Sequence, residues 1–222
     1  MENEQKTLPN VEQFFFFPCA IYRANLLDFL PATQEILDEH LKIFPTADEI
    51  YPINQTGSMY DTRIQGLLDY IGDMSWQILN EQGYNMDLFN CTISEFWGQR
   101  FYKHGQHIEH IHNMGVQLTG FYFVEVPENS SRPLIFDPRP GKKQINLPER
   151  DMTQVTQGST QINFDIKAGD ILLFNSWLGH GFTPNASDQE FRFIHFNIGV
   201  LPSPQPAAEP LAITSIEPVE II

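Results

Sequence analysis

The chain has 222 residues, 41% of them hydrophobic, so it is long enough to bury one core without disulfides to hold it together. It carries 28 acidic against 13 basic side chains, and its formal net charge of -15 repels phosphate backbones, so we expect no direct binding of nucleic acid. Cys19 and Cys91 lie far apart, which favours a reducing compartment: the cytoplasm, or the host cytoplasm for a viral protein. No apolar run approaches the roughly 20 residues of a membrane helix, so we expect no membrane span.

The N-terminal part, at about residues 24–82, is expected to be a helical lead-in. Residues 13–22 precede it and read as a strand, with the run of phenylalanines buried. Residues 31–43 open with a proline, which is favoured at a helix start, and place their aliphatic side chains on one face. Residues 61–82 repeat apolar groups near the helical period and begin at Asp61, a good N-cap. Two helices before a β-rich half predict helices packed on one outer face of a sheet.

From about residue 88 the pattern changes to short strands separated by Gly, Pro, Asn and Asp, which is typical of an antiparallel sandwich or barrel. Residues 140–160 are polar and read as a long loop. Residues 201–222 contain five prolines, a density that prevents a regular element, so we expect an extended tail there.

The histidines between these strands are the candidate ligands of a metal ion. On a strand, His110 and His112 point to the same face, so both imidazoles can reach one ion at about 2.1 Å. His180 comes much later, after a Gly-Asp turn and a buried strand, and is the candidate third ligand. This order of ligands is typical of cupins and double-stranded β-helices. The sequence therefore predicts one divalent metal ion bound by His110, His112 and His180.

Residues 97–199 resemble the iron(II)/2-oxoglutarate-dependent oxygenase superfamily, and most of all a branch found in marine bacteria and phages. The motifs that carry the resemblance are Trp97, Gly105, His110 with His112, Thr119-Gly120-Phe121-Tyr122, Phe136-Asp137-Pro138-Arg139, Gly169-Asp170, Phe174, Trp177-Leu178-Gly179-His180, Arg192 and Phe196-Asn197.

The resemblance implies a mainly β fold: a double-stranded β-helix, jelly-roll or cupin-like, with the N-terminal helices packed on the outside of the major sheet. Residues 1–200 would form a single oxygenase domain, with its metal-binding core at about 88–200. Iron(II) and 2-oxoglutarate would be the cofactors, with ascorbate as an accessory reductant.

The chain departs from the superfamily at the second ligand, which is usually Asp or Glu in a facial triad of two histidines and one carboxylate. Here His112 stands in that place. Another register, His107 with Glu109, would keep the carboxylate, so both registers stay open. The pair His110 and His112 is preferred because it lies nearer the Thr-Gly-Phe-Tyr strand.

The resemblance also implies an arginine that binds the distal carboxylate of 2-oxoglutarate. Arg192 is the candidate, although counting back from Phe196-Asn197 could place Phe191 inward instead, and Arg139 is the next candidate. Tyr102 and, less strongly, Tyr122 are candidates to donate a hydroxyl to the same carboxylate.

The activity implied is a dioxygenase that hydroxylates a small-molecule or peptidyl substrate and releases succinate and CO₂. Two other functions stay open: a three-His cupin dioxygenase that does not use 2-oxoglutarate, which explains His112 directly, and a non-enzymatic metal-binding structural protein. The identity of the substrate and the oligomeric state are not given by the sequence.

Overall fold

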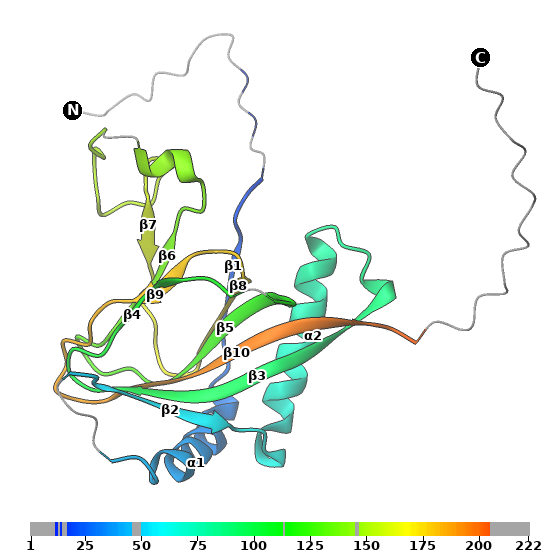
Figure 1. Cartoon of the computed structure of the whole chain (residues 1–222), viewed down its shortest axis with the longest axis vertical. Helices are drawn as coiled ribbons and strands as arrows, with labels where there is room; N and C mark the ends of the chain where they lie inside the picture. The colour runs from blue at the N-terminus through cyan, green and yellow to red at the C-terminus, as the bar shows by residue number, and fades with distance from the viewer. Residues whose placement is uncertain are drawn as a thin grey trace, which may run out of the picture.

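The computed structural model describes residues 12, 14, 17–45, 50–112, 114–144 and 147–204. Its strands form two antiparallel sheets that face each other, as Figure 1 shows. The large sheet has the order β1-β8-β5-β10-β3-β2 and the small sheet the order β4-β9-β6-β7. The elements are β1 (Ile21–Asn25), α1 (Leu30–Leu41), β2 (Ile53–Ser58), α2 (Gln65–Glu81), β3 (Phe89–Phe101), β4 (His107–His110), β5 (Val116–Glu125), β6 (Pro133–Phe136), β7 (Gln161–Asn163), β8 (Asp170–Asn175), β9 (His180–Phe182) and β10 (Phe191–Pro202). This is the double-stranded β-helix that the sequence predicts.

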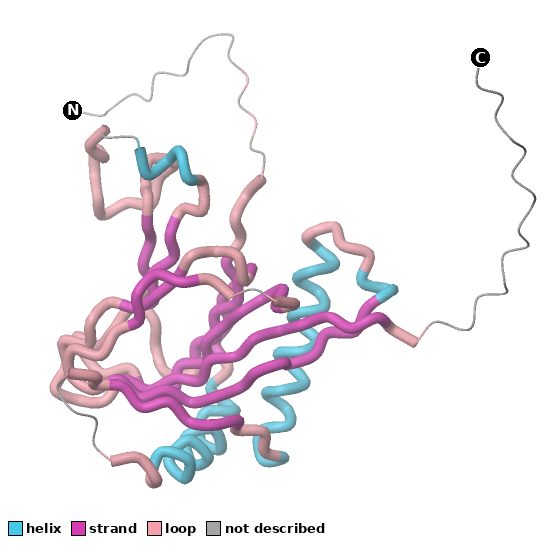
Figure 2. Tube along the Cα trace, viewed as in Figure 1, coloured by secondary structure: helices cyan, strands magenta, loops and turns pink. Residues whose placement is uncertain are grey.

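The two predicted helices form and pack against the large sheet, on the side away from the small sheet (Figure 2). Asp61 caps a short 3-10 helix that leads into α2, where its side chain accepts a hydrogen bond from the backbone N–H of Arg63 at 2.8 Å. Gly98 on β3 lets α1 approach closely, because a Cβ there would lie 2.2 Å from Leu37 Cδ1. The prediction of helices on the outer face of the major sheet is confirmed.

The N-terminal strand differs from the prediction. β1 begins only at Ile21, and the side chains of Phe14 and Phe17 are 68% and 96% exposed, so the expected burial of this run is wrong for these two residues. Pro18 has no backbone N–H to give to a ladder, and pairing with β8 begins after it.

The last strand ends slightly after residue 200. β10 continues through Pro202, and the backbone N–H of Ser203 donates to the carbonyl of Leu88 at 2.8 Å, so regular pairing extends past the predicted end at residue 200. The predicted tail beyond residue 204 lies outside the described residues. The extent of the single domain stays a prediction.

Side chains of β10 alternate between two hydrophobic cores. Ile194, Phe196 and Ile198 pack with the helices, whereas Phe191 and Phe193 pack between the two sheets. The core between the sheets is built mainly of phenylalanines.

Within the described ranges, no helix is both long and apolar enough to cross a bilayer. Both cysteines are free, and the cytoplasmic location stays a prediction.

Candidate metal centre

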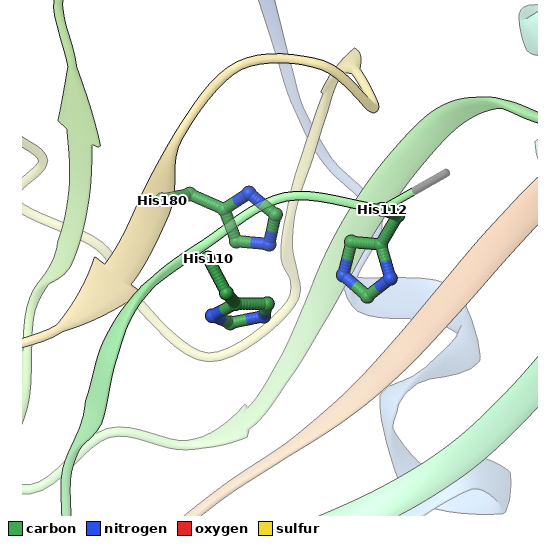
Figure 3. A group of neighbouring side chains, drawn as sticks. All are labelled: His110, His112 and His180. Atoms are coloured by element: carbon green, nitrogen blue, oxygen red, sulfur yellow. The ribbon is translucent and has the colours of Figure 1, made fainter.

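Two of the three predicted ligands face each other across paired strands of the small sheet. His110 is the last residue of β4 and His180 the first of β9, and the two are register partners. His112 lies two residues past the end of β4, where its backbone N–H donates to the carbonyl of Ser176 at 2.9 Å. That bond fixes the segment after β4 to the turn before His180. Figure 3 shows the three rings turned toward one another.

The three imidazoles can hold one ion. One ring nitrogen from each of His110, His112 and His180 lies within 4.8 Å of the other two. The Nδ1 atoms of His110 and His180 each lie 2.9 Å from a carbonyl oxygen, of Ile108 and Leu178 respectively. A carbonyl only accepts, so Nδ1 carries the proton in both rings and Nε2 keeps its lone pair.

Two of the ring nitrogens are buried and need a partner. In the described part of the chain, Nε2 of His112 and Nε2 of His180 have no hydrogen-bond partner. A buried polar atom without a partner costs free energy, which a bound metal ion would recover. Imidazole nitrogens suit iron, zinc, copper and nickel in the divalent state. The donor set and its unsatisfied nitrogens therefore fit a first-row transition metal.

Burial keeps His112 and His180 uncharged. Removal from solvent lowers the pKa of His112 to about 4, and repulsion from His110 adds to the effect. The same desolvation lowers the pKa of His180 to about 3. Protons therefore do not compete with a metal ion for these nitrogens at neutral pH.

The structure does not bring the alternative pair of ligands, His107 and Glu109, into the three-His cluster. Glu109 lies against Gly179, where a Cβ would be 2.8 Å from its Oε1 atom, and it does not join the three-His cluster. His107 instead bonds Gln99, with its Nε2 2.9 Å from the side-chain oxygen. The pairing of β4 with β9 shifts register between His107 and His110. The two side chains therefore have different partners: His107 bonds Gln99, and His110 belongs to the metal cluster.

The segment that carries this cluster matches a known family. Residues 95–197 match the family described as "Putative 2OG-Fe(II) oxygenase". Over these residues, the chain resembles the 2OG-Fe(II) oxygenases. Iron(II) and 2-oxoglutarate are the cofactors of this family, and the enzyme is an oxygenase that depends on both. Curated protein sequences give no match to the chain.

Solved structures of oxygenases share the fold. A prolyl-4-hydroxylase from Pseudomonas putida has a TM-score of 0.55 and 11% identity, over 81% of this chain and 91% of that one. HygX from Streptomyces hygroscopicus, with nickel, 2-oxoglutarate and hygromycin B bound, has a TM-score of 0.52 and 14% identity, over 82% of this chain and 83% of that one. The viral collagen prolyl hydroxylase of Paramecium Bursaria Chlorella virus-1 has a TM-score of 0.52 and 14% identity, over 81% of this chain and 94% of that one.

A cavity of about 310 Å³ lies beside the metal ligands of the oxygenase. Its walls come from both sheets and are formed by Gln55, Trp97, Gln99, His107, Ile108, His110, His112, Phe121, Phe182 and His195. Trp97 stacks on His195 with ring centroids 4.2 Å apart, and Nε2 of His195 lies 3.2 Å from the Thr119 hydroxyl. Burial holds the pKa of His195 well below its ordinary value.

Sequence reasoning missed Gln55 and Gln99 as residues of this cavity. The available signal was alternation along β3, which puts Trp97, Gln99 and Phe101 on the face toward the small sheet. Gln55 carries no such signal, because it reaches the cavity only through the pairing of β2 with β3 at Gln99.

None of the residues predicted to bind 2-oxoglutarate reaches this cavity. Tyr122 points toward the helices, where its hydroxyl donates to the Leu26 carbonyl at 2.8 Å. Tyr102 lies under the guanidinium of Arg100, whose Cζ is 4.9 Å from the ring centroid. Arg139 is paired with Asp137 in the turn after β6.

Arg192 also points out of the barrel. It is 7% exposed, its Nη1 lies 2.5 Å from the Asp38 carboxylate on α1, and its Nη2 pairs with Glu125 on β5. The cause is the register of β10: Phe191, Phe193 and His195 face the small sheet, so Arg192 faces the helices. Arg192 therefore joins α1 to the sheet, and its predicted contact with the cosubstrate is not supported.

Replacing Arg192 should affect stability and leave the metal site intact. We expect Arg192→Ala to lower the free energy of unfolding by about 1–3 kcal/mol, because the partly exposed carboxylates of Asp38 and Glu125 lose the largely buried cation that joins them. Urea denaturation measures the loss, and elemental analysis should find unchanged metal content. Loss of metal from a folded Arg192→Ala protein would contradict this assignment.

Proposed function

We propose that this oxygenase hydroxylates a carbon–hydrogen bond of a small-molecule or peptidyl substrate. Each turnover would consume one O₂ and one 2-oxoglutarate, and release hydroxylated product, succinate and CO₂. The proposal rests on the cluster of three imidazoles, two of which have an unsatisfied buried nitrogen, within the segment that matches the oxygenase family.

The chain's own residues would bind and orient the reactants. His110, His112 and His180 would hold the iron, and the hydrogen bonds of His110 and His180 to carbonyls fix the angle of their rings. Asn197, in contact with Glu95 and 3.2 Å from Nδ1 of His112, orients the third ring. Bound iron(II) with 2-oxoglutarate supplies the oxidising chemistry, in which one atom of O₂ enters succinate and the other enters the product.

The surroundings of the centre would exclude bulk water. Phe121, Phe182 and the stacked pair of Trp97 and His195 form apolar and aromatic walls. A dry site protects a strong oxidant from side reactions. Ile108, at 78% exposure, lies at the outer edge of the same cavity and would be the first residue that a substrate meets.

The substrate class rests on the structural relatives. The fold is shared with prolyl hydroxylases, one of them in complex with a peptide fragment of hypoxia inducible factor, and with HygX, which binds hygromycin B. Peptides and small molecules are therefore the two sets to screen.

The test is a mass-spectrometric screen of both sets with iron(II), 2-oxoglutarate and isotopically labelled O₂. We expect a product that gains one labelled oxygen atom and forms only when 2-oxoglutarate is present. The cluster contains no carboxylate, which favours a three-His dioxygenase as the second candidate function. A labelled product that forms equally well without 2-oxoglutarate would establish that second function and contradict the first.

A further inference from the structure

The cavity beside the metal centre has no positively charged wall. Within the described ranges, neither lysine nor arginine lines it. Phe191 and Phe193, at the inward positions of β10 on either side of Arg192, are fully buried in the core between the sheets and do not line the cavity. A dicarboxylate that chelates the metal through its 2-oxo acid end must therefore place its second carboxylate against neutral groups.

One wall of the cavity carries a chain of polar side chains. Nε2 of His107 bonds the side-chain oxygen of Gln99 at 2.9 Å, and Nε2 of Gln99 donates to the side-chain oxygen of Gln55 at 3.3 Å. In this arrangement, one N–H of the buried Gln99 is left for a ligand, and Gln55, which is exposed, accepts the other. Gln99 is 4% exposed and belongs to the cavity wall, so its amide meets a ligand away from bulk water.

A second observation also points to a ligand on this wall. Nε1 of Trp97, a donor that cannot accept, is buried and has no hydrogen-bond partner among the described residues. Trp97 and Gln99 are neighbours on the same face of β3, and both line the cavity. Buried donors without partners are costly, and a carboxylate oxygen would satisfy them.

We propose that Gln99, supported by His107 and Gln55, binds the distal carboxylate of 2-oxoglutarate through neutral amide donors in place of a cation. The inference rests on the proposed function. Hydrogen bonds to a charged acceptor are stronger than neutral ones, so a short row of amide donors can hold one carboxylate. Gln99 is thus a specificity-determining residue: it distinguishes 2-oxo acids that carry a second carboxylate from those that do not.

The test compares two ligands that share the 2-oxo acid end. Wild type and Gln99→Leu are loaded with iron(II) and titrated calorimetrically, without oxygen, with 2-oxoglutarate and with pyruvate, which has no second carboxylate. We expect Gln99→Leu to weaken 2-oxoglutarate binding by about 10- to 100-fold and to leave pyruvate binding nearly unchanged. Gln34→Leu is the matched control, because Gln34 lies on α1 and its amide bonds Glu125 outside the cavity.

A second variant guards against misfolding. Gln99→Glu keeps the size of the side chain and places a negative charge beside the ligand, so it should weaken 2-oxoglutarate binding at least as much as Gln99→Leu. Unchanged 2-oxoglutarate binding in both variants, or equal losses for both ligands, would overturn the inference. Metal-loaded wild type that binds neither 2-oxo acid would contradict the proposed function itself, which is a separate outcome.

Discussion

His180→Ala is expected to abolish stoichiometric metal binding, with affinity lowered by more than about 100-fold. His180 is completely buried and supplies the nitrogen that closes the cluster between β4 and β9. Two imidazoles would remain, one of them, His112, on the segment after β4, where its backbone bonds Ser176 and its ring contacts Asn197. Elemental analysis after dialysis against iron(II), together with metal titration, measures the loss.

His40→Ala is the control for this experiment. His40 lies on α1, on the opposite side of the large sheet, so its replacement should leave the metal content unchanged. Stoichiometric metal in a folded His180→Ala protein would contradict the assignment of the site.

Phe193→Ala is expected to cost about 3–5 kcal/mol of the free energy of unfolding. Its side chain is completely buried between the sheets, and its ring centroid lies 4.7 Å from that of Phe182 and 5.2 Å from that of Phe101. Truncation would leave a cavity between the rings of Phe182 and Phe101, which are too rigid to fill it. Guanidinium denaturation of the metal-free protein measures the loss.

Met152→Ala, at a side chain that is 87% exposed, is the control and should change the free energy of unfolding by less than about 0.5 kcal/mol. A loss below about 1.5 kcal/mol for Phe193→Ala would show that the core between the sheets repacks around the missing ring.

The sequence predicted the helices and the histidine cluster because both depend on short-range periodicity. The aliphatic face of residues 31–43 and the capped repeat of 61–82 became α1 and α2 within a few residues. His110 and His112 lie two residues apart, and the structure brings both to the same metal cluster although only His110 lies within β4. His180 was identified because it follows a Gly-Asp turn and a buried strand, in the same order as in the superfamily.

The residues around the cosubstrate could not be predicted in the same way. Whether Arg192 or Phe191 faces inward depends on whether β10 itself carries a bulge, which the sequence does not reveal. From Phe191 to Asn197, β10 pairs with β3 without a register shift, so regular alternation places Phe191 inward and Arg192 outward. Gln55 and Gln99 are far apart in the chain, and only the pairing of β2 with β3 brings them together.

The three-His centre is expected to bind iron and 2-oxoglutarate together. The most direct measurement is a calorimetric titration of 2-oxoglutarate, without oxygen, into the metal-free wild type, the iron(II)-loaded wild type and the His180→Ala protein exposed to the same iron. We predict binding of about one 2-oxoglutarate per chain to the iron-loaded wild type, and none to the other two. Equal binding in the metal-free protein, or no binding in the iron-loaded wild type, would contradict the claim.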